Sequence, residues 1–363
     1  MPAQVVTSPL LRLRAHALSH TLFRAPNLAA ALGRLRFVQA DPIRAPARAQ
    51  DLILRQRLEG YRAGDLERHY PNLELEEGIL YAYGFLERQL WRLRHPPNAV
   101  GLTRHERRLL ALVTELGAVH PGALQLEFGG RRARNAWGGY STVVKLGLER
   151  LHGRGLLRVA RRDKGIRVYE VSASAAAAAL PAADSLRALA LSVAEVLAPV
   201  SEQSLRSALA PLARALHVSG EARRALVALQ RDGQLEAGVF DGLTYLWPAR
   251  SAAALEQQEL PRQVRLLAPF DPLVWDRQRF EHLWGWAYRF EAYTPLARRV
   301  RGYYAMPLLW GQQVIGWGNL TRDADELHAE LGFVTRRPRE REFGVQLEAE
   351  LERLRDFLRA PTE

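Results

Sequence analysis

Two polar side chains stand two residues apart in the apolar segment Phe37–Ile43, and together they could act on a water molecule. In an extended backbone alternate side chains point to the same side, so Gln39 and Asp41 would face one way while their apolar neighbours anchor the segment from behind. Pro42 disfavours a helical conformation at Asp41, which supports an extended or turn conformation. A carboxylate beside a carboxamide can orient and activate one water, which suffices to hydrolyse a bond that is already weak.

A structural role for Asp41 is the main alternative. Aspartate is a favoured helix cap and proline a favoured first helical residue, so Asp41 could simply cap a following helix with Pro42 in its first turn. On spacing alone this cap is the more common arrangement, because short motifs often match by chance. Other features of the chain are needed to decide between the two interpretations.

The charge of the chain indicates a partner with many negative charges. The 363 residues carry a formal net charge of +12, and the sequence pI is about 10.5. This charge favours nucleic acid over a membrane surface. No stretch reaches the apolar length that spans a bilayer, and the N-terminus lacks a signal pattern, so we expect a cytoplasmic protein associated with the bacterial nucleoid. The length predicts two or three domains.

Two absences narrow the chemistry. The chain has no cysteine, which excludes disulfides, thiolate nucleophiles, iron–sulfur clusters and cysteine-ligated zinc. Lys145 and Lys164 are the only lysines among the 51 basic residues. Schiff-base chemistry needs an amine, so it has few candidate residues here.

Residues 1–100 are predicted to be mostly helical around the Gln39–Asp41 segment. Apolar periodicity predicts helices over residues 10–22, 27–35 and 47–58, and residues 73–83 are strand-like with Tyr81 and Tyr83 on one face. The third helix would place cations on or near its polar side, where Arg44, Arg48 and Arg55 fall, and Arg44 and Arg48 are expected to bind DNA.

Residues 101–175 have the order of elements of a winged helix. Thr103 and Glu106 have capping-box spacing, a short helix follows over residues 121–128, and a third helix is expected from Tyr140 with Val144, Leu148 and Leu151 facing the core. Strands over 156–159 and 166–171 would form the wing. The residues expected to contact DNA phosphates lie in the loop before the third helix, on that helix and at the wing tip: Arg131, Arg132, Arg134, Ser141, Lys145, Arg161, Arg162, Lys164 and Arg167.

Two further segments complete the chain after an alanine-rich spacer at 172–181. Residues 184–250 repeat the plan of helices followed by a hairpin around Asp241-Gly242, whose acidic tip favours packing over DNA contact. Residues 262–363 are predicted as a small antiparallel β-barrel or a curled sheet, with strands over 266–270, 289–293, 302–307, 313–320 and 327–333, and a terminal helix over 340–360. The overall fold class is therefore α+β, with tandem winged helices and a C-terminal barrel.

Other candidate sites have simpler explanations. His16 and His20 stand four apart on a predicted helix, but no third ligand is evident and helix-surface histidines are more common, so no metal and no cofactor are expected. The segment Gly139–Val143 lacks the final glycine of a nucleophile elbow. The aromatic stretch from Trp275 to Tyr304 could stack on unpaired bases, although aromatic residues in a barrel usually form its core.

Taken together, the sequence resembles the AlkZ/YcaQ-type winged-helix DNA glycosylases over nearly its full length. Three ordered segments carry the resemblance: residues 38–43 with Gln39 and Asp41, residues 137–170 from Trp137-Gly138-Gly139 to Tyr169-Glu170, and residues 268–307 from Ala268-Pro269-Phe270-Asp271 to Met306-Pro307. Residues 73–95 depart from the Glu-Tyr-Trp-Ala-His-type segment of better-known members, which puts substrate range in question more than reaction type.

The resemblance implies tandem winged helices around a DNA channel and excision of N7-alkylated purines, including interstrand crosslinks. Gln39 and Asp41 would hold and activate the attacking water. We expect a monofunctional glycosylase, since lysine is scarce, acting as a monomer on duplex DNA that carries alkylated bases or crosslinks. The alternative is a non-catalytic winged-helix DNA-binding protein or transcriptional regulator.

Overall fold

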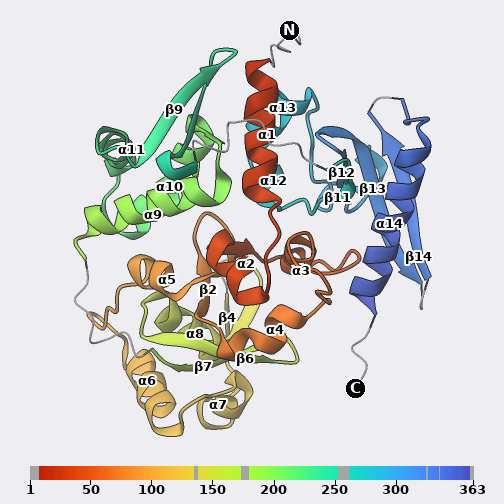
Figure 1. The fold of residues 1–363 in the computed structure, drawn as a ribbon. Coiled ribbons are helices and arrows are strands. Elements are labelled where there is room, and N and C mark those ends of the chain that lie inside the picture. The colour runs from red at the N-terminus through yellow and green to blue at the C-terminus, as the bar shows by residue number, and fades with distance from the viewer. Residues whose placement is uncertain are drawn as a thin grey trace.

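The computed structural model describes residues 8–134, 138–172, 180–251, 261–323, 326–334 and 336–359. Helices and small antiparallel sheets alternate along the chain, so the fold is α+β as expected. Helix α1 (Pro9–Thr21) stands between the third unit of the chain and the C-terminal sheet (Figure 1), where it contacts α12 and α13. No described helix is long and apolar enough to cross a membrane. The alanine-rich spacer at 173–179 and Trp137 lie outside the described residues.

The first unit surrounds a three-stranded sheet with the order β1-β3-β2. Its strands are β1 (Phe37–Gln39), β2 (Leu75–Ile79) and β3 (Tyr83–Glu87). Its remaining helices are α2 (Leu28–Leu35), α3 (Ala49–Leu54), α4 (Asp65–His69), the 3-10 turn η1 (Tyr70–Asn72) and α5 (Arg88–Arg94). The first two predicted helices are confirmed, and Asn27 caps α2 through Ala30 N–H.

Two predictions for this unit were wrong. Residues 73–83 form not one strand but a hairpin: Leu80 N–H bonds Ala82 O at 3.0 Å, Tyr81 packs edge-on between Phe37 and Trp275, and Tyr83 starts the next strand. The third helix is shorter than predicted and ends at Leu54. Arg55 is not on a polar face, because its side chain is 5% exposed and pairs with buried Glu350 of the C-terminal helix.

The second unit contains three helices and two hairpins. The helices are α6 (Arg104–Leu116), α7 (Pro121–Phe128) and α8 (Val143–Gly153). The strands are β4 (Arg132–Arg134), β5 (Tyr140–Thr142), β6 (Leu157–Asp163) and β7 (Ile166–Val171). The capping box of Thr103 and Glu106 is confirmed, and so is the fully buried stripe of Val144, Leu148 and Leu151.

Helix α8 begins three residues later than predicted. Tyr140–Thr142 pairs with Arg132–Arg134 as a short ladder, and the Thr142 hydroxyl accepts from Lys145 N–H to cap the helix. The predicted basic loop is therefore partly a hairpin, and Ser141 lies on a strand rather than a helix. The second hairpin is also longer than predicted, since Arg161 and Arg162 belong to β6 and only Lys164 and Gly165 make the turn.

The third unit again places helices before a hairpin. It contains α9 (Ala182–Leu197), β8 (Val200–Ser201), α10 (Glu202–Ala215), α11 (Glu221–Arg231), β9 (Leu235–Phe240) and β10 (Leu243–Pro248). The predicted Asp241-Gly242 turn is confirmed, with positive φ at both residues as a two-residue hairpin turn requires.

The C-terminal unit is a four-stranded antiparallel sheet in the order β11-β12-β13-β14, not a closed barrel. The strands are β11 (Val264–Leu266), β12 (Met306–Trp310), β13 (Gln313–Asp323) and β14 (Glu326–Phe333). Residues 289–293 are not a strand. Pro269 and Pro272 end the first strand early, and α12 (Pro272–Trp275), capped by Asp271, and α13 (Arg277–Trp284) follow. The terminal helix α14 (Arg341–Leu358) is confirmed and packs on β11.

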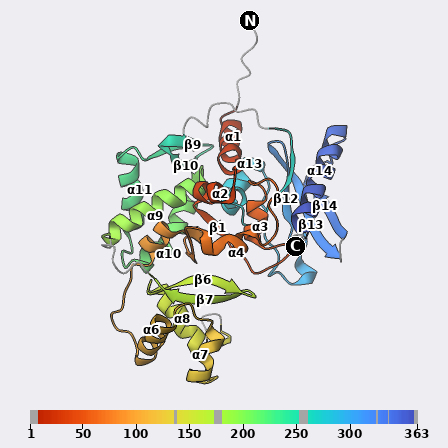
Figure 2. The same ribbon diagram turned by 60° about the horizontal axis from the view of Figure 1, so that its bottom comes forward.

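Buried polar contacts join the units. Arg57 and Asp271 form a fully buried ion pair between the first and C-terminal units. Asp276 accepts hydrogen bonds from Ser201 N–H and Oγ, both at 3.0 Å, which joins the C-terminal unit to the third. The second unit lies below the rest in Figure 2, with β6 against β2 of the first unit. These contacts fix the elements that surround Gln39 and Asp41.

Candidate active site

The sheet of the first unit holds Gln39 at the end of β1. Gln39 lies opposite Gly84 of β3, and Ala40 N–H donates to Tyr83 O at 3.0 Å, so the predicted extended conformation is confirmed as far as Ala40. A Cβ at Gly84 would lie 2.3 Å from Val38 O, so glycine is what allows the two strands to pair this closely. Strand pairing thus fixes the backbone that presents Gln39.

Asp41 follows in a turn and does not cap a helix. Its Oδ1 accepts a hydrogen bond from Ile43 N–H at 2.9 Å, a local turn contact two residues along the chain. The next helix, α3, begins only at Ala49 with Arg48 at its cap position, so the helix-cap alternative is wrong. Asp41 is half-buried, and this burial raises its pKa, while the Ile43 hydrogen bond opposes the rise. A carboxylate with a raised pKa is a stronger base than an exposed aspartate.

The side-chain oxygen of Gln39 has no hydrogen-bond partner among the described residues. This atom, Oε1, is also buried. Buried polar atoms are nearly always hydrogen-bonded in folded proteins, and an exception is often explained by function. This oxygen is therefore available to a water or a ligand beside Asp41.

Two tyrosines of the C-terminal unit lie near Asp41. The charge of Asp41 adds to burial in raising the pKa of Tyr304 and, at the surface, of Tyr293, so both phenols lie near this carboxylate. Tyr304 is 2% exposed and Tyr293 is 77% exposed. Phe290 packs edge-on against both rings. The aromatic stretch that was expected to form core thus also contributes a wall beside Asp41.

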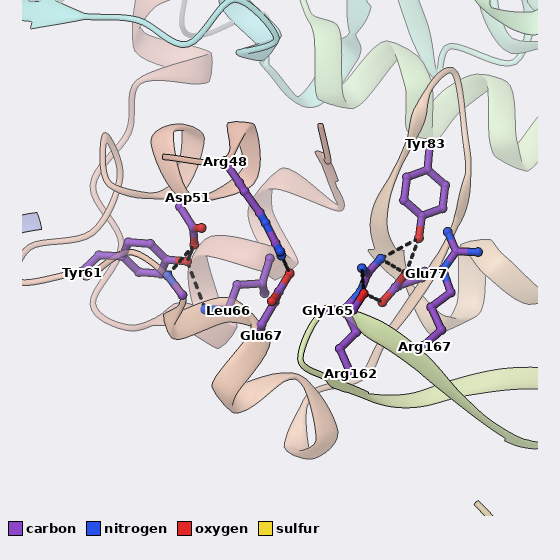
Figure 3. A network of polar contacts seen from close by, with 11 residues as sticks. Arg48, Asp51, Tyr61, Leu66, Glu67, Glu77, Tyr83, Arg162, Gly165 and Arg167 are labelled. Carbon is purple, nitrogen blue, oxygen red and sulfur yellow. Dashed lines mark hydrogen bonds and ion pairs between the residues drawn. The ribbon is translucent and has the colours of Figure 1, made fainter. Parts of the chain in front are cut away.

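The cations expected around this loop differ in their surroundings. Arg44 is exposed, whereas Arg48 is ion-paired with Glu67 (Figure 3). Both arginines line a cavity of about 270 Å³. The hairpin turn of the second unit reaches Arg48, because a Cβ at Gly165 would lie 3.6 Å from its Nη2 atom.

Two buried carboxylates of β2 tie the β6–β7 hairpin to the sheet of the first unit: Glu76 accepts from Arg158 at 2.7 Å, and Glu77 makes more contacts. Glu77 of β2 is 0% exposed; it accepts from Arg162 at 2.7 and 2.6 Å, from Arg167 at 3.1 Å and from the Tyr83 hydroxyl (Figure 3). Arg162 and Arg167 therefore neutralise Glu77 in this structure. Arg161 pairs with Asp163, and Lys164 is exposed at the turn with no ion pair among the described residues. The sequence did not single out Glu77, because its arginines lie 85 and 90 residues away.

The remaining predicted DNA-contact residues form a second group. They belong to the β4–β5 ladder and the first turn of α8, and their exposed members are Arg131, Arg132, Arg134 and Lys145. Arg132 donates to Tyr140 O at 3.2 Å across the ladder. Ser141 is half-buried in β5. This hairpin does not contain Gln39 or Asp41, so it is a separate basic surface.

The two histidines of α1 were expected at the helix surface, but they are not surface residues. His16 is 0% exposed, and His20 Nε2 lies 2.6 Å from Glu195 O. Within the described ranges no group of three or more histidine or acidic side chains could hold a metal ion.

Comparison with known proteins identifies the family. The family model "DNA glycosylase AlkZ-like" matches residues 32–357, which include Gln39 and Asp41. The chain belongs to the AlkZ-like DNA glycosylases. Its fold is similar to that of the DNA glycosylase AlkZ from Streptomyces sahachiroi, with a TM-score of 0.64, 14% identity, and coverage of 97% of this chain and 96% of that one. At this identity the second comparison speaks for the fold alone.

Family membership assigns this AlkZ-like chain to the DNA glycosylases and makes DNA its substrate. Gln39 and Asp41, the two catalytic candidates named from the sequence, lie on one short segment at the edge of the sheet. The sequence did not indicate that Tyr304, more than 260 residues later, faces that segment. A contact across such a separation leaves no local signal in the sequence.

Proposed function

We propose that this AlkZ-like glycosylase hydrolyses the N-glycosidic bond of N7-alkylguanine-type bases in duplex DNA and leaves an abasic site. The observation that supports this most is the half-buried Asp41 beside the uncommitted, buried oxygen of Gln39. A base alkylated at N7 carries a positive charge and is already a good leaving group. The protein then needs only to place a water and stabilise the sugar cation.

In the proposed reaction, water attacks C1′ of the sugar. As the bond between C1′ and N9 breaks, its electron pair stays on the base and neutralises it, and the sugar develops oxocarbenium character. The Asp41 carboxylate stabilises this cation and takes a proton from the water whose oxygen bonds C1′. Gln39 holds that water by a hydrogen bond. No amine is needed for these steps, in keeping with a monofunctional enzyme whose two lysines, Lys145 and Lys164, lie on the second unit.

The proposal extends to crosslinked bases and to the way the chain holds DNA. A crosslinked base cannot swing out of the duplex, so an enzyme that unhooks it must reach the lesion within the helix. The exposed cations expected to bind phosphates are Arg44, Arg131, Arg132, Arg134, Lys145, Arg161 and Lys164. We further propose that the chain acts as a monomer at the bacterial nucleoid.

An Asp41→Asn variant tests the reaction. The substrate is a duplex with one 7-methylguanine, and heating in alkali converts each abasic site into a strand break. We expect the single-turnover rate to fall at least about 100-fold, because the amide cannot accept a proton, while the DNA dissociation constant stays within about twofold. A parallel duplex with one interstrand crosslink tests unhooking.

Two outcomes would contradict the proposal. Base release by Asp41→Asn at the wild-type rate would remove Asp41 from the mechanism. Salt-sensitive binding without base release by the wild-type chain would instead favour a non-catalytic DNA-binding protein.

A further inference from the structure

The segment that carries Tyr304 is held in place from one side by a single carboxylate. Glu291 is 6% exposed, and its Oε2 atom accepts hydrogen bonds from three consecutive backbone N–H groups: Val300 at 2.9 Å, Arg301 at 2.7 Å and Gly302 at 3.3 Å. Such a carboxylate fixes an irregular segment as firmly as strand pairing would. The chain just before Tyr304 therefore has one defined path.

Two more contacts fix the residues next to Tyr304. Asn319 Nδ2 donates to Arg301 O at 2.6 Å, and its side chain fills the space beside Gly302, whose φ of +115° favours glycine. On the other side the Tyr288 hydroxyl donates to Ala305 O at 2.7 Å. Tyr304 thus sits in a segment whose backbone is held on both sides, although Asn319 Oδ1 has no hydrogen-bond partner among the described residues.

The Tyr304 hydroxyl also lacks a partner in the described part of the chain. The Tyr304 ring packs edge-on against Phe290 at 5.3 Å between centroids, yet its hydroxyl is buried without a hydrogen bond to any described residue. Burying an unpaired hydroxyl costs free energy, so a structure that positions this phenol so firmly gains nothing from the hydroxyl for its own stability. A phenylalanine would serve the packing equally well.

Tyr304 lies beside the catalytic loop. It lines a cavity of about 420 Å³ together with Ala45, four residues after Asp41. The Asp41 charge adds to burial in raising the pKa of the phenol, so Tyr304 stays neutral at physiological pH and keeps its proton to donate. Gln39 Oε1 and the Tyr304 hydroxyl are therefore two buried, uncommitted polar atoms near one carboxylate.

We propose that Tyr304 is a positioning residue of the hydrolytic site, whose hydroxyl donates a hydrogen bond to the attacking water. This inference rests on the proposed function. Water offers two hydrogens and two lone pairs in tetrahedral directions. Asp41 and the Gln39 oxygen take the hydrogens, and the Tyr304 hydroxyl binds one lone pair, so the remaining lone pair points at C1′ of the damaged nucleotide. The proton goes to Asp41, and the base leaves with the electron pair of the broken bond.

A Tyr304→Phe variant tests the inference in the full-length protein with the 7-methylguanine duplex. We expect the single-turnover rate at saturating enzyme to fall about 100-fold, because a water with one constraint fewer is misaligned with C1′. The DNA dissociation constant and the thermal unfolding midpoint should not fall. Tyr245→Phe is the matched control: it removes the hydroxyl of a fully buried tyrosine of the third unit that is hydrogen-bonded to His282 Nδ1 at 2.8 Å, so it should lower the unfolding midpoint and change the rate far less.

A double variant separates a role through the water from a general effect. If Tyr304 acts on the water that Asp41 deprotonates, adding Tyr304→Phe to Asp41→Asn should slow the reaction little further, whereas independent effects would multiply. If the wild-type protein releases base and the Tyr304→Phe variant releases it equally fast, this inference is overturned while the proposed function stands. A Tyr304→Phe protein that unfolds also overturns it, since the hydroxyl would then be structural. A wild-type chain that releases no base overturns the proposed function and this inference together.

Discussion

At the scale of single residues, the proposed chemistry depends on how far the Asp41 carboxylate is buried from solvent. Its carboxylate is half-buried and accepts one backbone hydrogen bond, from Ile43. Burial raises its pKa from the ordinary aspartate value, while the hydrogen bond lowers it by less. The balance leaves Asp41 more basic than a fully exposed aspartate.

The raised pKa of Asp41 predicts a shifted acid limb in the pH–rate profile. Asp41 must be ionised to accept a proton, so we expect base release to decrease as pH falls, with a midpoint above the pKa of an ordinary aspartate. Single-turnover rates on a 7-methylguanine duplex, corrected for uncatalysed release at each pH, would measure this. A rate that stays constant through that range while the DNA remains bound would show that the ionisation of Asp41 is not required.

The sequence was informative about these residues only where the signal is local. Gln39 and Asp41 were singled out from their types and their spacing before Pro42, because strand alternation and the effect of proline act on neighbours. Spacing alone favoured a helix cap at Asp41, and the hydrolytic interpretation came from the family resemblance. Tyr304 and Glu77 were not recognised, because their roles arise from contacts between distant segments. Arg55 and Arg162 were assigned to solvent or phosphate for the same reason, since no local pattern shows that buried Glu350 and Glu77 await them.

At the scale of elements, the β1–β3 pair determines where Gln39 lies. Gly84 is packed so closely that a Cβ there would meet Val38 O at 2.3 Å and the Phe37 ring at 2.8 Å. The backbone oxygen cannot move aside without breaking the strand pair. The position of Gln39 therefore depends on a residue that makes no contact with DNA in the proposed mechanism.

A Gly84→Ala substitution should impair both stability and activity. We expect the free energy of unfolding to fall by about 1–3 kcal/mol, because an added methyl group overpacks the strand pair, and base release to slow even where the protein is fully folded. Gly33→Ala is the matched control, since no atom lies within 4 Å of a Cβ there and alanine favours the helix α2. Urea unfolding and single-turnover assays would measure the two effects, and a Gly84→Ala protein that behaves like Gly33→Ala would contradict this view.

Element boundaries were predicted least well where tertiary pairing replaced a local preference. The stretch at 73–83 became a hairpin because Tyr81 packs between Phe37 and Trp275, and helix α8 lost its first turn to the ladder with β4. Helix α2, capped by Asn27, the capped start of α6 and helix α14, with its apolar stripe, were predicted closely. The sequence left a barrel and a curled sheet open, and the structure has an open sheet, because alternation marks strands but not whether a sheet closes.

At the scale of the whole molecule, several buried histidines link folding to pH. His16, His95 and His152 are at most 7% exposed, and burial is the first cause that lowers their pKa values, to about 3, 3 and 4. In the unfolded chain these groups bind protons near pH 6.5. The unfolded state thus takes up protons that the folded state excludes.

Stability should therefore fall between neutral and mildly acidic pH. The contribution of these histidines is fully present above pH 6.5 and is lost as pH falls from there towards the folded-state pKa values. At pH 5.5 we expect a loss of about 1.4 kcal/mol per histidine relative to pH 7.5, or about 4 kcal/mol in total. Urea unfolding at the two pH values measures this. Equal free energies of unfolding would show that these side chains are protonated within the fold.

The contact between Glu77 and the β6–β7 hairpin has a consequence for protein engineering. Glu77, a fully buried carboxylate on the sheet of the first unit, is neutralised by two arginines of the hairpin. The hairpin therefore cannot be exchanged independently of that sheet. A chimera that takes this hairpin from another family member would need arginines at the same register. Otherwise it would leave a negative charge stranded in the protein interior, and the graft would weaken the sheet that presents Gln39.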